Sequence, residues 1–313
     1  MTCRKLTFNL LLVTCLFGAV TGAGCGNYSN EDLEFMSALP EKQELAAVVP
    51  TRSALVLGET AEYYQLTRNV ALIFNGITEA FLGVIDTIRA FPPTTRRPNQ
   101  RIWGPFPAEK QPGWMIRMVM LRDGATFIYD LQFQPASAPS SNWLTLIHGH
   151  YAVTGGVRRG QGQITVDTVP LRDAGVDPDL GYLKNLTVDY TTSEFPIDVK
   201  LMFVNFDNPL KPDDPKQGTY EYSVQSNGQG ALTFDYFADA ISGPVVEEAL
   251  VTSRWLGTGE GRADWQLVAG DAFVGAHATE CWNRLFRAVY IDKPWAPLES
   301  IGTPADCPAI PTL

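Results

Sequence analysis

The chain has 313 residues, of which 45% are hydrophobic and 11% aromatic, and this is enough apolar material for a substantial core. Disorder over most of the chain is therefore excluded. The formal net charge is −10, and the one basic cluster, formed by Arg96, Arg97 and Arg101, is short. A nucleic-acid partner is not expected, because binding a phosphate backbone depends on clustered Lys and Arg.

The chain begins with the three parts of an export signal. Arg4 and Lys5 precede an apolar run over residues 6–20, and small residues follow over 21–24. The run is shorter than the roughly 20 residues of a membrane-spanning helix, so we interpret residues 1–24 as a signal peptide that is removed on export.

The residues around the expected cleavage point resemble those of bacterial lipoprotein precursors. Ala23, Gly24 and Cys25 match the small residues and the cysteine that end a lipobox. The resemblance implies that Cys25 receives a diacylglyceryl group, becomes the N-terminus and anchors the protein to a membrane. Gly26 after it implies the outer membrane. Gly22 stands where this class usually has an aliphatic residue, and cleavage near the same point by a general signal peptidase is the alternative.

The cysteines fit an oxidising compartment. Cys3 and Cys15 lie in the signal peptide, and Cys25 is the lipidation candidate. The remaining two, Cys281 and Cys307, are predicted to form one disulfide, which closes a loop of about 25 residues and stabilises the fold by roughly 3 kcal/mol. A metal or redox role is the alternative, and the lack of a CxxC motif disfavours it.

Residues 25–57 are predicted to be a tether with short helices. Ser29 or Asn30 caps a first helix that ends before Pro40, and a second helix is expected over 41–49. Both helices precede the long helical segment of the chain.

Segment 58–91 is the one long helix that the sequence predicts, and Pro92 ends it. Its apolar residues recur at steps of three and four and form one stripe: Leu66, Val70, Ile73, Phe74, Ile77, Phe81, Val84, Ile85 and Ile88. Such a helix needs an apolar surface to pack on, and the strands that follow are expected to supply it.

Residues 92–113 are predicted to be a connector that leads into a β-meander over 114–282. Turn residues such as Asp123–Gly124 and Asn227–Gly228 separate apolar runs that alternate with period two, which is typical of β-hairpins. The expected hairpins pair 114–121 with 125–134, 143–154 with 157–168, 183–191 with 197–206, 219–225 with 231–238 and 248–257 with 262–270, and a further strand is expected over 275–282. Residues 283–313 form a proline-rich tail that the disulfide pins.

Together these elements predict an α+β protein in which residues 58–313 form one domain. Ten or eleven strands in an antiparallel meander make a wide sheet, and a sheet this wide usually curls or closes. We therefore expect a half or closed barrel around the long helix. This architecture is similar to that of the periplasmic carriers of the LolA and LolB type, a likeness of fold that implies no function.

Few residues suggest a catalytic or metal site. His148 and His150 lie two apart on an expected strand, so both point to one face, and with His277 they are candidates for zinc. Ordinary histidines on a polar face are the preferred interpretation, because the spacing fixes no third ligand. No catalytic residue and no cofactor site is predicted.

Other polar motifs are expected to be structural. The glycine-rich segment 155–162 lacks the order of a phosphate-binding loop, and its glycines are expected to permit a tight turn, a bulge or a close approach by the helix. The acidic segment 207–214 does not match an EF-hand and is expected to be a solvated loop. Four strand aspartates are expected on the polar face rather than as paired carboxylates for glycoside chemistry: Asp130, Asp167, Asp189 and Asp235.

The sequence therefore favours an exported, lipid-anchored protein of the cell envelope with a non-enzymatic structural or protein-interaction role. One alternative is a carrier that binds an apolar ligand or a lipid on the concave face of the sheet, which requires a deep uncharged cavity. The other is a hydrolase of envelope material, which requires titratable residues that converge in a cleft.

Overall fold

The computed structural model describes residues 28–51, 60–139, 141–156, 158–177, 180, 183–192, 195–208, 211–238, 246–271 and 275–310. The predicted signal peptide, Cys25 and the expected helix start at residue 58 lie outside these ranges. The helices are α1 (Asn30–Ser37), α2 (Lys42–Leu45), α3 (Glu62–Arg89), α4 (Val169–Asp173) and the 3₁₀ turns η1 (Pro297–Glu299) and η2 (Pro304–Asp306). The strands are β1 (Thr95–Arg97), β2 (Gln100–Pro107), β3 (Trp114–Asp123), β4 (Thr126–Pro135), β5 (Leu144–Val153), β6 (Gly160–Asp167), β7 (Asn185–Thr191), β8 (Ile197–Asn208), β9 (Lys211–Val224), β10 (Gly230–Ala238), β11 (Glu247–Trp255), β12 (Gly261–Ala269), β13 (His277–Trp282) and β14 (Ala288–Asp292).

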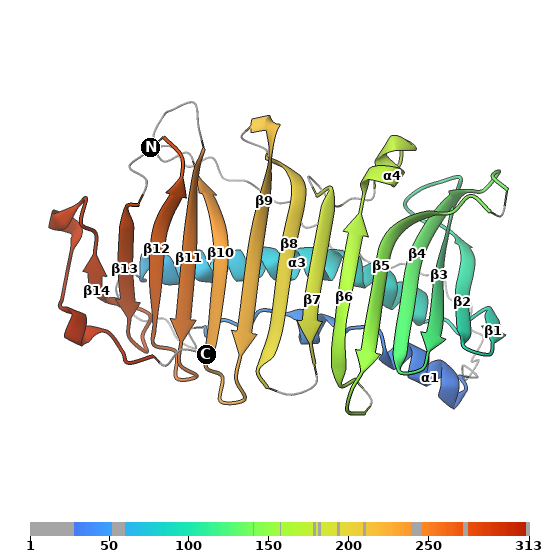
Figure 1. Ribbon diagram of the computed structural model, residues 1–313, viewed down its shortest axis with the longest axis horizontal. Helices are drawn as coiled ribbons and strands as arrows, with labels where there is room; N and C mark the ends of the chain where they lie inside the picture. Colours follow the sequence, from blue (N-terminus) through green and yellow to red (C-terminus); the bar gives the residue numbers. More distant parts are fainter. Residues whose placement is uncertain are drawn as a thin grey trace.

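The predicted long helix is α3, whose 28 residues lie behind the sheet and run across its strands (Figure 1). At about 1.5 Å per residue it is about 42 Å long. Val70, Phe74, Phe81 and Ile85 are buried, as the predicted stripe requires, whereas Ile73 is 59% exposed. By length and composition α3 also qualifies as a membrane-spanning segment, but its buried residues pack on the sheet, and core helices pass the same test.

The strands form one 14-stranded antiparallel sheet in chain order, so the predicted meander is confirmed. The register also places Tyr222 opposite Leu232 and Tyr220 opposite Phe234. Two strands, β1 and β2, lie in the segment 92–113 that was expected to be a connector, and β14 lies in the expected tail. The sequence did not predict these three strands, because prolines and glycines in the two segments are more typical of loops.

The predicted half or closed barrel is wrong, because the sheet is open and not strongly curled (Figure 1). Fourteen strands at about 4.8 Å spacing make a sheet about 60 Å wide. Because α3 runs across the strands, it spreads the apolar layer along the width of the sheet, and burial of that layer does not require β1 to meet β14.

Both edges of this open sheet are protected against pairing with another chain. At one edge β1 has only three residues, and its Arg96 and Arg97 are exposed. At the other edge Ile291 of β14 exchanges two backbone hydrogen bonds with Ile301 of the tail, at 2.9 and 3.0 Å. The predicted disulfide between Cys281 and Cys307 is present and holds this tail. Short charged edges and covered edges are the usual protection of open sheets.

The core lies between α3 and one face of the sheet, and side chains alternate along each strand as predicted. In β4 Phe127, Tyr129, Leu131 and Phe133 are buried on the helix side, whereas the residues between them point to the other face. Among the described residues no long helix covers the second face, and we call it the open face.

Glycines opposite large aromatic residues give the helix side of the sheet its shape. A Cβ at Gly149 would overlap the ring of Tyr129 on the neighbouring strand, and one at Gly162 would overlap the ring of Tyr190. The same holds for Gly230 with Trp255 and for Gly261 with Trp282. Gly162 of the glycine-rich segment therefore makes room for an aromatic ring of the next strand, which the sequence interpretation did not anticipate.

A buried ion pair holds α1 against the first strands. Asp32 is fully buried and accepts from Arg101 Nε at 2.5 Å and from Arg96 Nε at 2.9 Å. Ser29 caps α1 as predicted, through a reciprocal pair of bonds with Asp32. The second helix, expected over 41–49, is confined to the four residues of α2.

Candidate functional site

The open face of the sheet carries a row of polar side chains that crosses most of the strands. The register aligns eight of them on β6 to β13: Gln163, Asp189, Lys200, Glu221, Thr233, Thr252, Asp264 and Thr279. Alternate pairs of neighbours in the row bond to each other, as in Gln163 Nε2 to Asp189 Oδ1 at 2.7 Å and Lys200 Nζ to Glu221 Oε1 at 2.5 Å. The row therefore forms an ordered polar surface.

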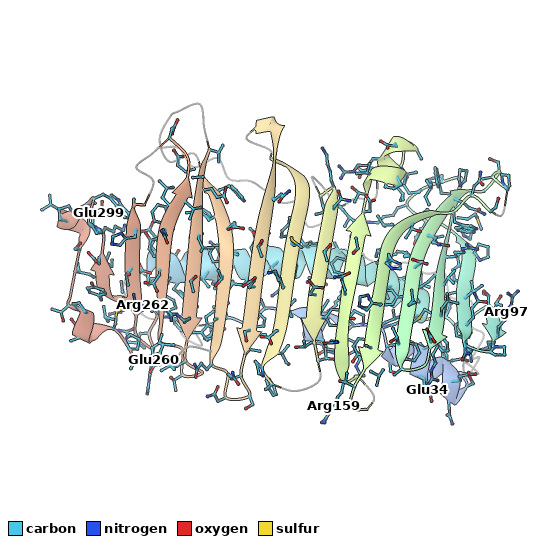
Figure 2. All side chains as sticks on the ribbon, viewed as in Figure 1. Glu34, Arg97, Arg159, Glu260, Arg262 and Glu299 are labelled. Atoms are coloured by element: carbon cyan, nitrogen blue, oxygen red, sulfur yellow. A yellow bond between two sulfur atoms is a disulfide. The ribbon has the colours of Figure 1, made fainter. Side chains whose placement is uncertain are left out.

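Charged side chains also mark the rim of this surface in Figure 2. Arg97 lies at the β1 edge and Glu299 at the β14 edge. Toward the β14 edge Asp264 accepts from Arg254, Arg262 and Thr279 at 2.6–3.0 Å. Burial opposes ionisation of Asp264, but the hydrogen bonds from Arg262 and Thr279 outweigh it and lower the pKa of this carboxyl.

A second polar cluster lies on the open face of β3, β4 and β5. Arg117 Nε donates to Gln132 Oε1 at 2.8 Å, and the Arg117 guanidinium lies 4.0 Å from the centre of the Trp143 ring. Burial lowers the pKa of Arg117, and the negative charge of Asp130 opposes this shift. A guanidinium on an indole face is a cation–π contact that orients both groups.

Asp130 of β4 and His148 of β5 form the imidazole–carboxylate pair of this cluster. His148 Nδ1 lies 2.8 Å from Asp130 Oδ1, and the imidazole is 57% exposed. His150 lies on the same face, opposite Ile128 and Gln163. The predicted common face of the two histidines is thus observed.

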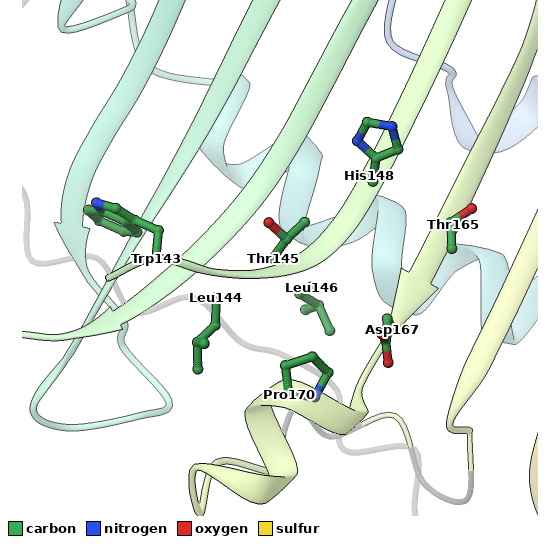
Figure 3. Close-up of a pocket in the computed structure, with 8 residues that line it drawn as sticks. All are labelled: Trp143, Leu144, Thr145, Leu146, His148, Thr165, Asp167 and Pro170. Atoms are coloured by element: carbon green, nitrogen blue, oxygen red, sulfur yellow. The ribbon is translucent and has the colours of Figure 1, made fainter. Parts of the chain in front are cut away.

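Next to this pair a pocket of about 430 Å³ opens between β5, β6 and α4 (Figure 3). Its apolar wall is formed by Leu144, Leu146 and Pro170. The register shift in β5 at Leu146 leaves Leu146 and Ile147 both buried, and both side chains belong to the core cluster, so the pocket reaches the margin of the core. We call this hollow the open-face pocket.

Polar groups form the remaining wall of the open-face pocket. They are Thr145, His148, Thr165 and Asp167, together with Trp143, whose ring is apolar apart from its N–H, and Figure 3 shows Trp143 and His148 on opposite sides of Thr145. Behind this wall lie Arg117, Gln132 and Asp130, which contact Trp143, Thr145 and His148, respectively. The wall residues are therefore held by a second set of polar side chains.

The short helix α4 is fixed in place over the pocket. The hydroxyl of Thr168, which is fully buried, donates to Leu183 O at 2.7 Å. Asp167 Oδ1 accepts from the backbone N–H of Val169 at 3.0 Å. The two bonds tie the start of α4 to the segment before β7 and to the end of β6, so Pro170 keeps its position at the pocket wall.

A second hollow, of about 400 Å³, lies under the C-terminal tail. It is lined in part by Trp282, Leu285, Val289 and Pro308. Neither of these two hollows lies between α3 and the sheet, where the described side chains form one continuous apolar cluster.

The other candidates from the sequence do not converge with His148. His277 lies on β13, opposite Gln266, far along the sheet from β5. Asp189 accepts from Gln163, and Asp235 accepts from the backbone N–H of Thr219 at 2.7 Å. Among the described residues no group of three or more His, Cys, Asp and Glu side chains is arranged to hold a metal ion.

Sequence reasoning missed Arg117, Gln132 and Trp143 as parts of one cluster. The three come from two strands and a loop, and only the register of β3, β4 and β5 brings them together. The alternation in β4 already placed Asp130 and Gln132 on the polar face, but nothing local identifies their neighbours.

Comparison of the chain with protein-family models, with curated proteins and with solved structures finds no match.

Proposed function

We propose that this chain is an exported, lipid-anchored protein of the bacterial envelope that acts without catalysis, through binding at the open face of its sheet. The observation that carries the proposal is the polar row, a surface of aligned side chains that bond in pairs and that no described long helix covers. One face of this wide sheet is solvated, and its polar side chains are ordered. This arrangement supports a role for that face in binding another molecule.

The position of the first described residue supports the anchoring part of the proposal. Tyr28 Oη donates to Ala90 O at 3.0 Å, so the chain meets the C-terminal end of α3 only three residues after Cys25. Three extended residues span about 10 Å. A lipid on Cys25 would therefore hold this end of the protein close to the membrane.

The packing on the helix side favours binding at the surface over carriage of a lipid. Phe74, Phe81 and Phe234 fill the layer between α3 and the sheet, and each is at most 1% exposed. A carrier needs an apolar cavity that accommodates its ligand. The open-face pocket has a partly polar wall, and none of the residues that line it lies on α3.

The anchoring part is tested by the intact mass of the protein from membranes of a bacterial host, for the natural chain and for Cys25→Ser. We expect a diacylglyceryl mass on the natural chain and its loss in the variant. An unmodified natural chain that starts near residue 25 would refute the anchor.

The contact surface is tested by cross-linking in intact cells from a photoreactive residue at position 187, which lies on the open face of β7. Lys200→Glu changes the middle of the polar row, and Lys42→Glu is the matched control, because both lysines are about equally exposed and each pairs with one glutamate. We expect K200E to abolish a cross-linked species that K42E leaves intact. Equal effects of the two variants would contradict a role for the open face.

A further inference from the structure

We propose that the open-face pocket binds a neutral saccharide. This inference deepens the proposed function, since it names the ligand class for one part of the open face. The volume of about 430 Å³ lies within the range of roughly 300–1,000 Å³ typical of small-molecule sites.

The wall combines two kinds of surface that a sugar ring needs. A pyranose has an apolar face of C–H groups and a rim of hydroxyls that both donate and accept hydrogen bonds. Trp143, Leu144 and Pro170 offer apolar surface, whereas Thr145, Thr165 and the carboxylate of Asp167 offer hydrogen-bonding groups. A purely apolar ligand would shield these polar groups from water and leave part of their hydrogen-bonding capacity unused, which is costly.

The charge of the pocket favours a neutral ligand over an anion. Asp167 lines the pocket, and Asp130 lies behind its wall in contact with His148. The nearest guanidinium, Arg117, is engaged by Gln132 and by the Trp143 ring. A phosphate or sulfate in the pocket would face these carboxylates, whereas a sugar hydroxyl donates to a carboxylate favourably.

The wall is also held in position before any ligand arrives. Arg117 orients Trp143, Gln132 Nε2 lies 3.4 Å from Thr145 Oγ1, and Asp130 orients His148. All three supporting residues lie on β3 and β4, within the sheet. Side chains that are fixed in advance lose less conformational entropy on binding.

Saturation-transfer NMR and calorimetry on the full mature protein in detergent test the proposal. The probes are maltotriose, cellotriose, chitotriose and mannotriose, with glucose 6-phosphate as the anionic comparison. We expect saturable binding of at least one neutral probe, and Trp143→Ala should weaken it about tenfold or more. Trp295→Ala is the matched control, because Trp295 is 49% exposed and lies in the tail, away from the pocket.

Three outcomes would overturn the proposal. In the first, no neutral probe binds saturably at concentrations up to about 10 mM. In the second, W143A and the natural chain bind the neutral probe with equal affinity. In the third, glucose 6-phosphate binds more tightly than every neutral probe. A negative result for saccharide binding is distinct from a negative result for lipidation, because lipidation is measured separately from the intact mass of the protein. A lipidated chain without saccharide binding would refute the ligand class alone.

Discussion

The backbone N–H of Tyr63 donates to Glu280 Oε1 at 2.7 Å, although the two residues lie 217 positions apart in the chain. Glu280 of β13 also accepts from the N–H of Glu62 at 2.9 Å, and its side chain is almost fully buried. The residue before α3, Ala61, has no side chain that could cap the helix. A carboxylate from the far end of the sheet therefore satisfies the free N–H groups of the first turn.

Replacing this tertiary cap should destabilise the fold. Glu280→Ala removes the acceptor of the N–H groups of Glu62, Tyr63 and Tyr64, and we expect a loss of about 2–4 kcal/mol in the free energy of unfolding by urea. Glu280→Gln keeps one carbonyl oxygen as an acceptor and should lower the free energy of unfolding by less. The control is Glu299→Ala, because Glu299 pairs only at the surface with Lys293. A loss in E280A no larger than in E299A would contradict the capping role.

Asp32 should make stability depend on pH in the acid range. Hydrogen bonds from Ser29, Arg101 and Arg96 outweigh the effect of burial and lower the pKa of Asp32 from 3.8 to about 2. The folded state therefore binds this proton less readily than the unfolded state. The resulting stabilisation, about 2 kcal/mol, is complete well above pH 3.8 and is lost as the pH falls toward 2.

Asp32→Asn tests this dependence. At pH 7 it should cost several kcal/mol, because Arg101 is left buried with only Glu31 as its acidic partner, and the cost should shrink toward pH 2. Glu280 titrates with the opposite sign, since burial raises its pKa and its contribution falls as the pH rises above 4.5. The natural chain and D32N both contain Glu280, so the difference between their free energies of unfolding isolates the contribution of Asp32. A cost that is independent of pH would contradict the assignment.

Gly149 should be intolerant of any side chain. Gly149→Ala places a Cβ inside the ring of Tyr129, and because Tyr129 is itself fully packed we expect a loss of about 1–3 kcal/mol. The matched control is Gly76→Ala in α3, where nothing lies within 4 Å of the added Cβ. That change should stabilise the protein by about 0.5–1 kcal/mol. Thermal unfolding of both variants measures the contrast, and effects of the same sign would contradict it.

Removal of the disulfide should weaken the β14 edge in particular. In the double variant Cys281→Ser, Cys307→Ser we expect a loss of about 3 kcal/mol, because the closed loop no longer restricts the unfolded chain. Release of the tail would also remove the bonds of Ile301 to Ile291 and expose the strand edge. Hydrogen exchange at the amide of Ile291 should accelerate more than exchange in β4. Uniform acceleration would argue against a local role.

The order and pairing of the strands were predictable because each hairpin is local. Turn pairs such as Asn227–Gly228 lie between segments in which apolar and polar residues alternate. Neighbouring segments of this kind pair directly, as Tyr222 does with Leu232. The disulfide followed from the count of cysteines, and the helix from its apolar steps. In the candidate site the common face of His148 and His150 and the polar-face positions of Asp130 and Gln132 were predictable, since each depends on spacing within one strand.

The sequence by itself determined the helix, the meander, the disulfide and the polar face, because each depends on residues close in the chain or on a count. The tertiary structure decided the rest. Whether the sheet closes depends on the direction in which α3 crosses it, and no local pattern encodes that angle. The cap on Tyr63 and the grouping of Arg117 with Trp143 depend on register and on a strand far away. Such contacts form only when the whole sheet is assembled, so the sequence pattern does not predict them.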